Sequence, residues 1–294
     1  MKELPNPTFA LSPVASPQFS RGSLCQSSHA VVAPVQKPVV GKITVSWARH
    51  QDEVRQAQRL RYQVFALEMG ATLPKTVAGH DIDLFDDYCE HLLVRDEESG
   101  EVIGTYRVLT PTQAKRVGST YSDTEFDLTR LRGLRERMVE LGRSCVHADH
   151  RHGGVILALW GALAEFMSRN QLDTMIGCAS IPMQHQGVAS GHAAASIWRQ
   201  LSQTHLAPVE YRVTPRLALP VERLDGSLVV EAPALIKGYL RLGAKVLGAP
   251  AWDPDFKSAD LPMMMRIADL APRYQKHFAG SPARASVGGN ARGA

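Results

Sequence analysis

One segment of the sequence narrows the choice of folds more than any other part of the chain. Residues 138–146 form a short run with the composition of a strand, and the pair Gly153-Gly154 follows it. A long apolar helix pattern then occupies residues 154–169. A strand that leads through a glycine turn into a helix is typical of sheets covered by helices. The segment therefore predicts an α/β fold.

The patterns on both sides of this segment extend the same architecture. Apolar residues recur at helical spacing from Val54 to Leu67, and the polar run 96–100 ends in glycine, as a hairpin connection does. Further strands are predicted over 43–47, 91–95, 101–109, 174–179, 209–213, 244–248 and 263–267. Further helices are predicted over 191–201 and 234–242.

The length and composition predict one large domain with two tails. The chain has 294 residues, of which 44% are hydrophobic, enough for a sizeable core in a single domain. Residues 1–41 contain scattered Pro and Ser without helix or strand periodicity, and residues 273–294 become rich in Gly, Ala, Ser and Arg. We expect both tails to be disordered, with the domain spanning 42–272.

The charge and the cysteines exclude several classes of protein. A net charge of +4 is a mild bias toward anionic partners and too weak to indicate nucleic-acid binding. No two of the four cysteines form a C-x-x-C pair, and this favours a protein of the reducing cytoplasm. The longest apolar stretch, 155–164, is far shorter than the roughly 20 residues of a membrane span. A cytoplasmic protein is expected.

The glycine turn is a candidate phosphate site. Gly153 and Gly154 would let the backbone approach an anion at the start of the helix, where unpaired N–H groups and the helix dipole favour negative charge. Arg151 could add a charged contact. The alternative, that the two glycines only make a tight connection, stays open.

With Arg151-x-x-Gly154 at the start of this helix, the order of elements resembles the GNAT acyltransferase superfamily. The resemblance implies a mixed, mainly antiparallel twisted sheet flanked by helices, with a C-terminal extension. It also implies that the residues around the turn bind the pantetheine arm of the donor, namely Val146, Arg151, Gly153 and Gly154. Ile156 stands where the superfamily usually has Gly or Ala. This departure favours acyl carrier protein, with its single phosphodiester, over coenzyme A.

Four shorter motifs resemble the acyl-homoserine-lactone synthases. These are Arg61-x-x-x-Phe65, Asp83-x-x-Asp86, Arg107 and Glu140-x-x-Arg143. In that family, Arg61, Phe65, Asp83, Asp86 and Arg107 would contact substrate, and Glu140 and Arg143 would be catalytic.

The C-terminal third, taken with two motifs that begin at Gly142 and Ile176, resembles the bacterial L-ornithine Nα-acyltransferases, a hemolysin-like branch of GNAT, and the resemblance spans roughly residues 43–270. The resemblance rests on Gly142-Arg-Ser-Cys-Val-His, Ile176-Gly-Cys-Ala-Ser, the run from Pro233 and Ala251-Trp-Asp-Pro-Asp-Phe. It implies transfer of a 3-hydroxyacyl group from acyl carrier protein to the α-amine of L-ornithine, giving lyso-ornithine lipid. The phosphopantetheine of the carrier protein would be the donor, with no bound cofactor. Peripheral contact with the inner membrane is a further hypothesis, centred on residues 235–242.

The chemistry needs a group that takes the proton of the attacking amine, and Glu140 is the best candidate. Partial burial would raise its pKa. The alternative is an ion pair of Glu140 with Arg143 that only supports the sheet. Residues three apart on a regular strand face opposite sides, so both can reach one site only through an irregularity. We therefore predict a β-bulge within residues 141–143, where Gly142 permits it.

The acceptor would be held by charge. Asp83 and Asp86 could bind the ammonium groups of ornithine, and Arg61, Arg107 or Arg143 could bind its carboxylate. Helix capping and ordinary surface charge remain alternatives for each residue. For the acyl chain, the helix after Gly154 and the residues Leu261 and 263–265 could form an apolar groove, with core packing as the alternative.

Several other signals are weaker. The group of His147, Asp149, His150 and His152 lacks the spacing of a metal site, so no metal is predicted. An acyl-enzyme on Cys145 or Cys178 would need an activated thiolate. Two other functions stay open: synthesis of an acyl-homoserine lactone from S-adenosylmethionine, and a non-catalytic GNAT-like protein that binds or acts on membranes.

Overall fold

The computed structural model describes residues 42–74, 77–151 and 153–270. The tails predicted over 1–41 and 273–294 lie outside the described residues, as does His152 of the histidine group. Residues 75, 76, 152, 271 and 272 of the domain predicted over 42–272 also lie outside the described residues.

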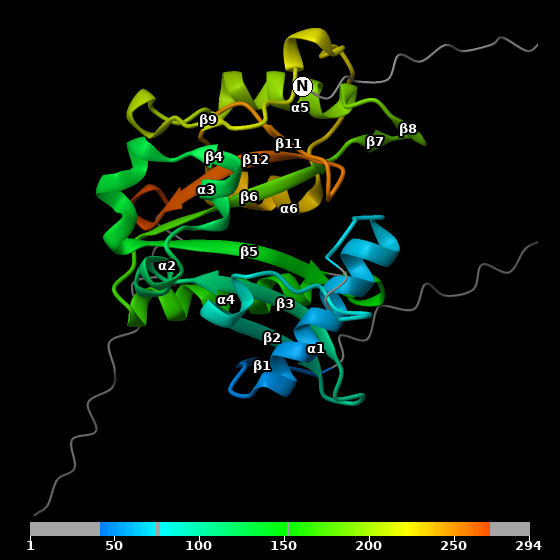
Figure 1. The fold of residues 1–294 in the computed structure, drawn as a ribbon, viewed down its shortest axis with the longest axis vertical. Coiled ribbons are helices and arrows are strands. Elements are labelled where there is room, and N and C mark those ends of the chain that lie inside the picture. The colour runs from blue at the N-terminus through cyan, green and yellow to red at the C-terminus, as the bar shows by residue number, and fades with distance from the viewer. Residues whose placement is uncertain (1–41, 75–76, 152, 271–294) are drawn as a thin grey trace, which may run out of the picture. The chain divides into compact units, whose positions relative to one another are not determined.

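The described chain alternates between strands and helices (Figure 1). The strands of the main sheet are β1 (Ile43–Trp47), β2 (Glu90–Asp96), β3 (Val102–Leu109), β5 (Met138–Val146), β6 (Thr174–Pro182), β10 (Lys245–Val246), β11 (Ala251–Asp253) and β12 (Ser258–Arg266). Two small sheets consist of β4 (Phe126–Asp127) with β9 (Thr214–Pro215), and β7 (Gln184–His185) with β8 (Val188–Ala189). The α-helices are α1 (Gln51–Tyr62), α2 (Pro111–Val117), α3 (Tyr121–Glu125), α4 (Gly154–Arg169), α5 (His192–Thr204) and α6 (Ala234–Leu242).

The main sheet is antiparallel at every pairing but one. Its order is β1-β2-β3-β5-β6-β12-β10, with β11 also paired to β12, and β5 runs parallel to β6. Parallel neighbours need a crossover connection, and α4 supplies it. The mixed, mainly antiparallel α/β fold predicted for the chain is confirmed.

Helices cover both faces of the sheet. On one face, α4 packs on β2 and β3, and a Cβ on Gly104 would lie 2.4 Å from Val155. On the same face α5 and α6 pack on β6 and β12 through Ile197, Ile236 and Leu261. The opposite face carries α1 and the short helix α3. We call these the α4 face and the α3 face.

The parallel pair β5–β6 separates soon after it begins. Pairing joins only residues 138–140 of β5 to residues 174–176 of β6. Beyond Glu140 the two strands diverge, as Figure 1 shows, although each continues for several more residues. At the branch point, a Cβ on Gly177 would lie 2.3 Å from the Leu141 carbonyl oxygen. Only glycine lets the two backbones approach this closely before they part.

A β-bulge in β5 follows directly after the branch point. Gly142 pairs with Arg107 and Cys145 with Thr105, so β5 has one more residue than β3 between these pairs. A bulge is present as predicted, but it lies at Arg143–Ser144 and overlaps the predicted range 141–143 only at Arg143. Arg143 itself adopts a φ of 49°, so glycine was not required for the irregularity.

The sequence patterns were wrong or incomplete in a few elements. The strand predicted over 209–213 is instead a 3₁₀ turn, Val209–Tyr211, in which the Tyr211 N–H donates to the Pro208 carbonyl. The strand over 244–248 shortens to Lys245–Val246. The helix after β1 ends as a six-residue π-helix, Gln63–Glu68, and the short helices α2 and α3 were not predicted.

The close approach at the branch point makes a stability prediction. Gly177→Ala should lower the free energy of unfolding by about 3 kcal/mol, because its Cβ would collide with a backbone atom that cannot move without separating β5 from β6. Urea denaturation would measure this. Gly161→Ala is the matched control, since Gly161 lies in α4 with nothing within 4 Å of an added Cβ and should be neutral or stabilising. Equal effects of the two substitutions would contradict the tight branch point.

Candidate active site

A cavity of about 590 Å³ occupies the space where β5 and β6 diverge. Residues 141–146 of β5 and 178–180 of β6 line it, so the cavity runs along the fork between the strands. Its lining includes residues from both faces of the sheet: Tyr121 belongs to α3, and Ile156 and Tyr239 belong to α4 and α6. The volume is in the usual range for small-molecule sites.

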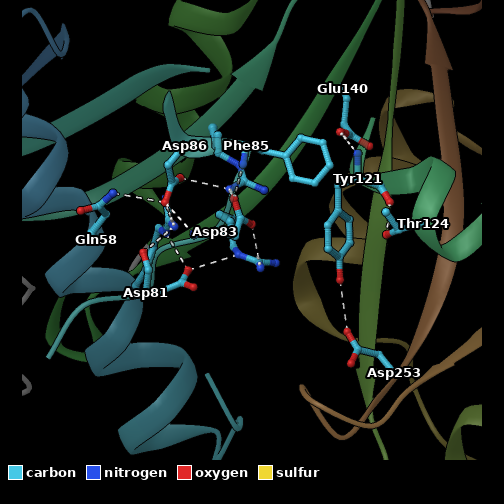
Figure 2. A network of polar contacts seen from close by, with 12 residues as sticks. Gln58, Asp81, Asp83, Phe85, Asp86, Tyr121, Thr124, Glu140 and Asp253 are labelled. Atoms are coloured by element: carbon cyan, nitrogen blue, oxygen red, sulfur yellow. Dashed lines mark hydrogen bonds and ion pairs between the residues drawn. The ribbon is translucent and has the colours of Figure 1, made fainter. Parts of the chain in front are cut away.

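Glu140 lies at the branch point, on the α3 face. Its side chain is buried, and its two oxygens accept hydrogen bonds from the backbone N–H of Tyr121 (2.7 Å) and of Ser122 (2.6 Å). Figure 2 shows the contact with Tyr121. Burial raises the pKa of Glu140 above its ordinary value, although these hydrogen bonds act in the opposite direction. The Ser122 side chain also hydrogen-bonds Glu140, so three of about four acceptor positions of the carboxylate are occupied and one is left for a proton.

The bulge places Arg143 on the same face as Glu140. The Arg143 guanidinium lies over the rings of Tyr121 and Phe256, at 5.1 and 4.5 Å from their centroids. It forms ion pairs with Asp81 (3.2 Å) and Asp83 (3.1 Å). The ion pair of Arg143 with Glu140, the structural alternative for these two residues, is not among the contacts of the described residues. Both side chains line the cavity.

Arg143 belongs to a largely buried network of ion pairs. It consists of three arginines and three aspartates: Arg61, Arg107, Arg143, Asp81, Asp83 and Asp86. Arg61 lies 2.7 Å from both Asp81 and Asp86, and Arg107 lies 2.6 Å from Asp83. Burial alone would raise the pKa of Asp86, but the charge and hydrogen bonds of Arg61 hold it well below its usual range. The network neutralises its own charges.

This network changes the interpretation of the predicted acceptor residues. Asp86 is 4% exposed and its oxygens are taken up by Arg61, Arg107 and Gln58. Asp83, Asp86 and Arg61 do not line the cavity, whereas Arg107 and Phe65 do. The charge of each aspartate is therefore balanced by the chain's own arginines, which leaves Asp86 no position from which to bind an ammonium group in the cavity.

The residues predicted to bind the pantetheine arm of the acyl donor lie at the other end of the fork. Val146, Arg151 and Gly153 line the cavity, and Gly154 does not. Gly153 has a φ of 90° and precedes α4, and no side chain among the described residues caps the first N–H groups of the helix. Arg151 donates to Glu68 at 2.7 Å, which balances the charge expected to reach a phosphate.

Hydroxyl groups line the middle of the cavity on the α4 face. Tyr106 and Tyr239 share a hydrogen bond, and Ser144 in the bulge interacts with both. Burial raises the pKa of Tyr106 to about 12, so its phenol stays protonated at neutral pH. Burial also raises the pKa of Cys145 to about 12 and that of Cys178 well above its ordinary value. A nucleophilic thiolate at either cysteine is therefore not supported.

Two buried acids in the cavity wall were not predicted. Asp253 ends β11 and Asp260 lies in β12, and both are at most 5% exposed. Burial and repulsion by Asp253 raise the pKa of Asp260 to about 6, against hydrogen bonds from Ser180 and Ser258. Glu125, at the end of α3, has its pKa raised to about 7 by burial and by these two acids. The sequence did contain one signal for this site, because Asp260 is an acidic residue within the largely apolar strand β12.

The predicted acyl groove is only partly confirmed. Ile156 and Trp160 of α4 line the cavity, together with Leu235 of α6. Leu261 and Met263 pack in the core instead, at 0% and 5% exposure.

The same core takes the apolar side of α6. Ile236 is 1% exposed and offers no surface to a lipid bilayer, and Tyr239 lines the cavity. No helix in the described part of the chain is long and apolar enough to cross a membrane.

Comparison with known proteins identifies the family. Residues 60–161 match the Acetyltransferase (GNAT) domain. The L-ornithine N(alpha)-acyltransferase of Rhodobacter capsulatus is 35% identical over 246 residues, which cover 79% of this chain and 92% of that protein. The chain belongs to the L-ornithine Nα-acyltransferase family. The protein of the same name from Brucella abortus is 32% identical, over 81% of this chain and 89% of its own length.

Solved structures with a similar arrangement are more distant in sequence. A coenzyme A-dependent acyl-homoserine lactone synthase is 15% identical, with a TM-score of 0.47 over 82% of this chain and 92% of its own. An N-acyl amino acid synthase from uncultured soil microbes is 10% identical, with a TM-score of 0.45 over 78% of this chain and 94% of its own.

The ion network makes a prediction for Asp86. Asp86→Asn should lower the free energy of unfolding by about 3 kcal/mol, because it leaves Arg61 and Arg107 short of a buried counter-charge. Chemical denaturation would measure the loss, with Asp87→Asn, an exposed neighbour, as control. An Asp86→Asn protein as stable as the wild type but with a raised KM for the acceptor would show that Asp86 binds substrate instead.

Proposed function

We propose that this protein transfers a 3-hydroxyacyl group from the phosphopantetheine thioester of acyl carrier protein to the α-amine of L-ornithine, giving lyso-ornithine lipid. The family supports the acceptor, since its named members are L-ornithine N(alpha)-acyltransferases. The observation that carries the proposal is the cavity at the β5–β6 fork. It joins a charged wall on the α3 face to an apolar wall on the α4 face.

The α3 face suits an amino-acid acceptor. Arg143 offers a guanidinium to its carboxylate, and Glu140 lies at the branch point as a base with a raised pKa. An amine attacks a thioester only when it is neutral, so Glu140 takes its proton directly or through a water molecule. Tyr121 connects Glu140 with Arg143, because its N–H binds Glu140 and its ring packs under Arg143.

The α4 face and the fork suit the donor. The phosphodiester of the pantetheine arm lies at the uncapped start of α4, beside Gly153. The arm continues along the diverging edge of β5, where the bulge frees backbone groups from the ladder. The acyl chain then lies against Ile156, Trp160 and Leu235.

The reaction is direct aminolysis. The amine nitrogen forms a bond to the thioester carbon, the carbon–sulfur bond breaks, and the amine proton passes to Glu140. The leaving thiolate takes up a proton from solvent that the hydroxyl groups of Tyr106, Tyr239 and Ser144 relay on the donor side of the fork, so each hydroxyl ends the step protonated. Backbone N–H groups of the bulge stabilise the developing oxyanion. Glu140 returns its proton to solvent after release of product.

A thiol-release assay tests the proposed reaction. Incubation with 3-hydroxyacyl carrier protein and L-ornithine should release the carrier thiol, and mass spectrometry should find the Nα-acyl product. Replacing ornithine by S-adenosylmethionine should leave only background release. Turnover with S-adenosylmethionine would indicate an acyl-homoserine-lactone synthase. A lack of turnover with either acceptor would indicate a non-catalytic protein.

The role of Glu140 as base makes a kinetic prediction. Glu140→Gln should lower kcat/KM on the order of 100-fold or more, because glutamine cannot accept the amine proton. Wild-type kcat/KM should rise as pH rises through the raised pKa of Glu140, and the variant should lack that rise. Glu136→Gln, an exposed residue just before β5, is the control. A variant with a wild-type pH profile would exclude Glu140 as the base, whatever its effect on stability.

A further inference from the structure

The acids of the cavity wall differ from the other buried acids of the α3 face. Asp81, Asp83 and Asp86 each lie within 3.2 Å of an arginine. Asp253 and Asp260 have no such partner among the described residues. Their hydrogen bonds come from neutral donors. Ser180 and Ser258 (2.9 Å) donate to Asp260, and Tyr121 (3.2 Å) and the N–H groups that follow Asp253 donate to Asp253.

Buried carboxylates without a counter-ion are costly. A charge removed from water is stabilised only by an opposite charge or by many hydrogen bonds, and two carboxylates side by side repel each other. Asp253 and Asp260 lie on paired strands, with Ala251 opposite Asp260 and Asp253 opposite Ser258. Both line the cavity, so a cation that enters the cavity can reach them.

The opposite wall of the same cavity contains an arginine with donors to spare. Arg143 has five N–H groups, and its hydrogen bonds within the described residues use one of them, to Asp83. Its Nε lies 3.2 Å from Asp81 but is buried without a hydrogen bond. That nitrogen is out of reach of a ligand, but the other unused N–H groups belong to a side chain that lines the cavity. One wall of the cavity thus carries unused arginine N–H donors, and the other carries carboxylates without an arginine partner.

Tyr121 connects these two walls to Glu140. Its backbone N–H binds Glu140, its ring packs under Arg143, and its hydroxyl donates to Asp253. Figure 2 shows Tyr121 extending from Glu140 at one end to Asp253 at the other. A zwitterion with a second amino group at the end of its side chain matches this order of charges.

We propose that Asp260, supported by Asp253, binds the side-chain ammonium of the acceptor and selects a diamino acid over a neutral amino acid. The carboxylate of the acceptor pairs with Arg143, and its α-amine lies toward Glu140. This inference rests on the proposed function and adds the residue that sets its acceptor class. Asp83 and Asp86, which the sequence suggested for this role, instead balance the chain's own arginines.

A comparison of ornithine with norvaline isolates the ammonium. Norvaline has the same carbon chain without the terminal amine. Wild-type protein should bind ornithine more tightly than norvaline in isothermal titration calorimetry and acylate it with a higher kcat/KM. Asp260→Asn should lower both values for ornithine on the order of 100-fold and leave those for norvaline nearly unchanged. Asp260→Glu should recover part of the preference, because it restores the charge.

Asp255→Asn is the matched control. Asp255 is an exposed residue of the β11–β12 turn, close in sequence to Asp253 and outside the cavity lining, so its loss should not change the preference. Circular dichroism and thermal melting would establish that each variant is folded. The split between the two ligands is the decisive readout, since misfolding would weaken both.

The outcomes separate this inference from the proposed function. If the wild type prefers ornithine and Asp260→Asn keeps that preference, the inference is overturned while the function stands. If the wild type binds ornithine no more tightly than norvaline, the inference is overturned whatever the turnover. If it binds ornithine through Asp260 but does not acylate it, the proposed reaction fails and the ammonium site stands.

Discussion

The structure depends on the early separation of two parallel strands. β5 and β6 pair over three residues and then diverge, at a point where Gly177 lies directly against the Leu141 carbonyl. Had the pairing continued, the sheet would be closed and the residues of β5 would face only core. Because it stops, a cavity passes along the fork and reaches both faces of the sheet. The bulge at Arg143–Ser144 then turns Arg143 to one face and Ser144 to the other.

Charge balance separates the residues that support the site from those that would bind substrate. Arg61, Arg107 and Arg143 together balance the three aspartates near them, which fixes the position of Arg143 at a cost in desolvation. Asp253 and Asp260 have no such balance, and the pKa of Asp260 is raised accordingly. An enzyme that binds a charged substrate keeps counter-charges incomplete until the substrate arrives, and these acids fit that requirement.

Much of the fold could be predicted from the sequence, and less of the site. The strand, glycine turn and helix of residues 138–169 were recognisable because their periodicities are long. The need for a bulge near Gly142 followed from the spacing of Glu140 and Arg143. The five-residue helix α3 was too short to show any periodicity in the sequence. Its first N–H groups nevertheless bind Glu140, and it carries Tyr121. Charge matching alone could not tell that Asp86 pairs with Arg61 whereas Asp260 lacks a partner, since that distinction exists only in three dimensions.

The most direct test of this account is a crystal structure with L-ornithine and a stable acyl-pantetheine analogue in which a thioether replaces the thioester. The account predicts that the pantetheine arm lies between β5 and β6, with its phosphate end at the start of α4. Ornithine should lie on the α3 face, with its α-amine near the Glu140 carboxylate. Density for the arm outside the fork, or a Glu140 carboxylate that no ligand atom approaches, would contradict the account.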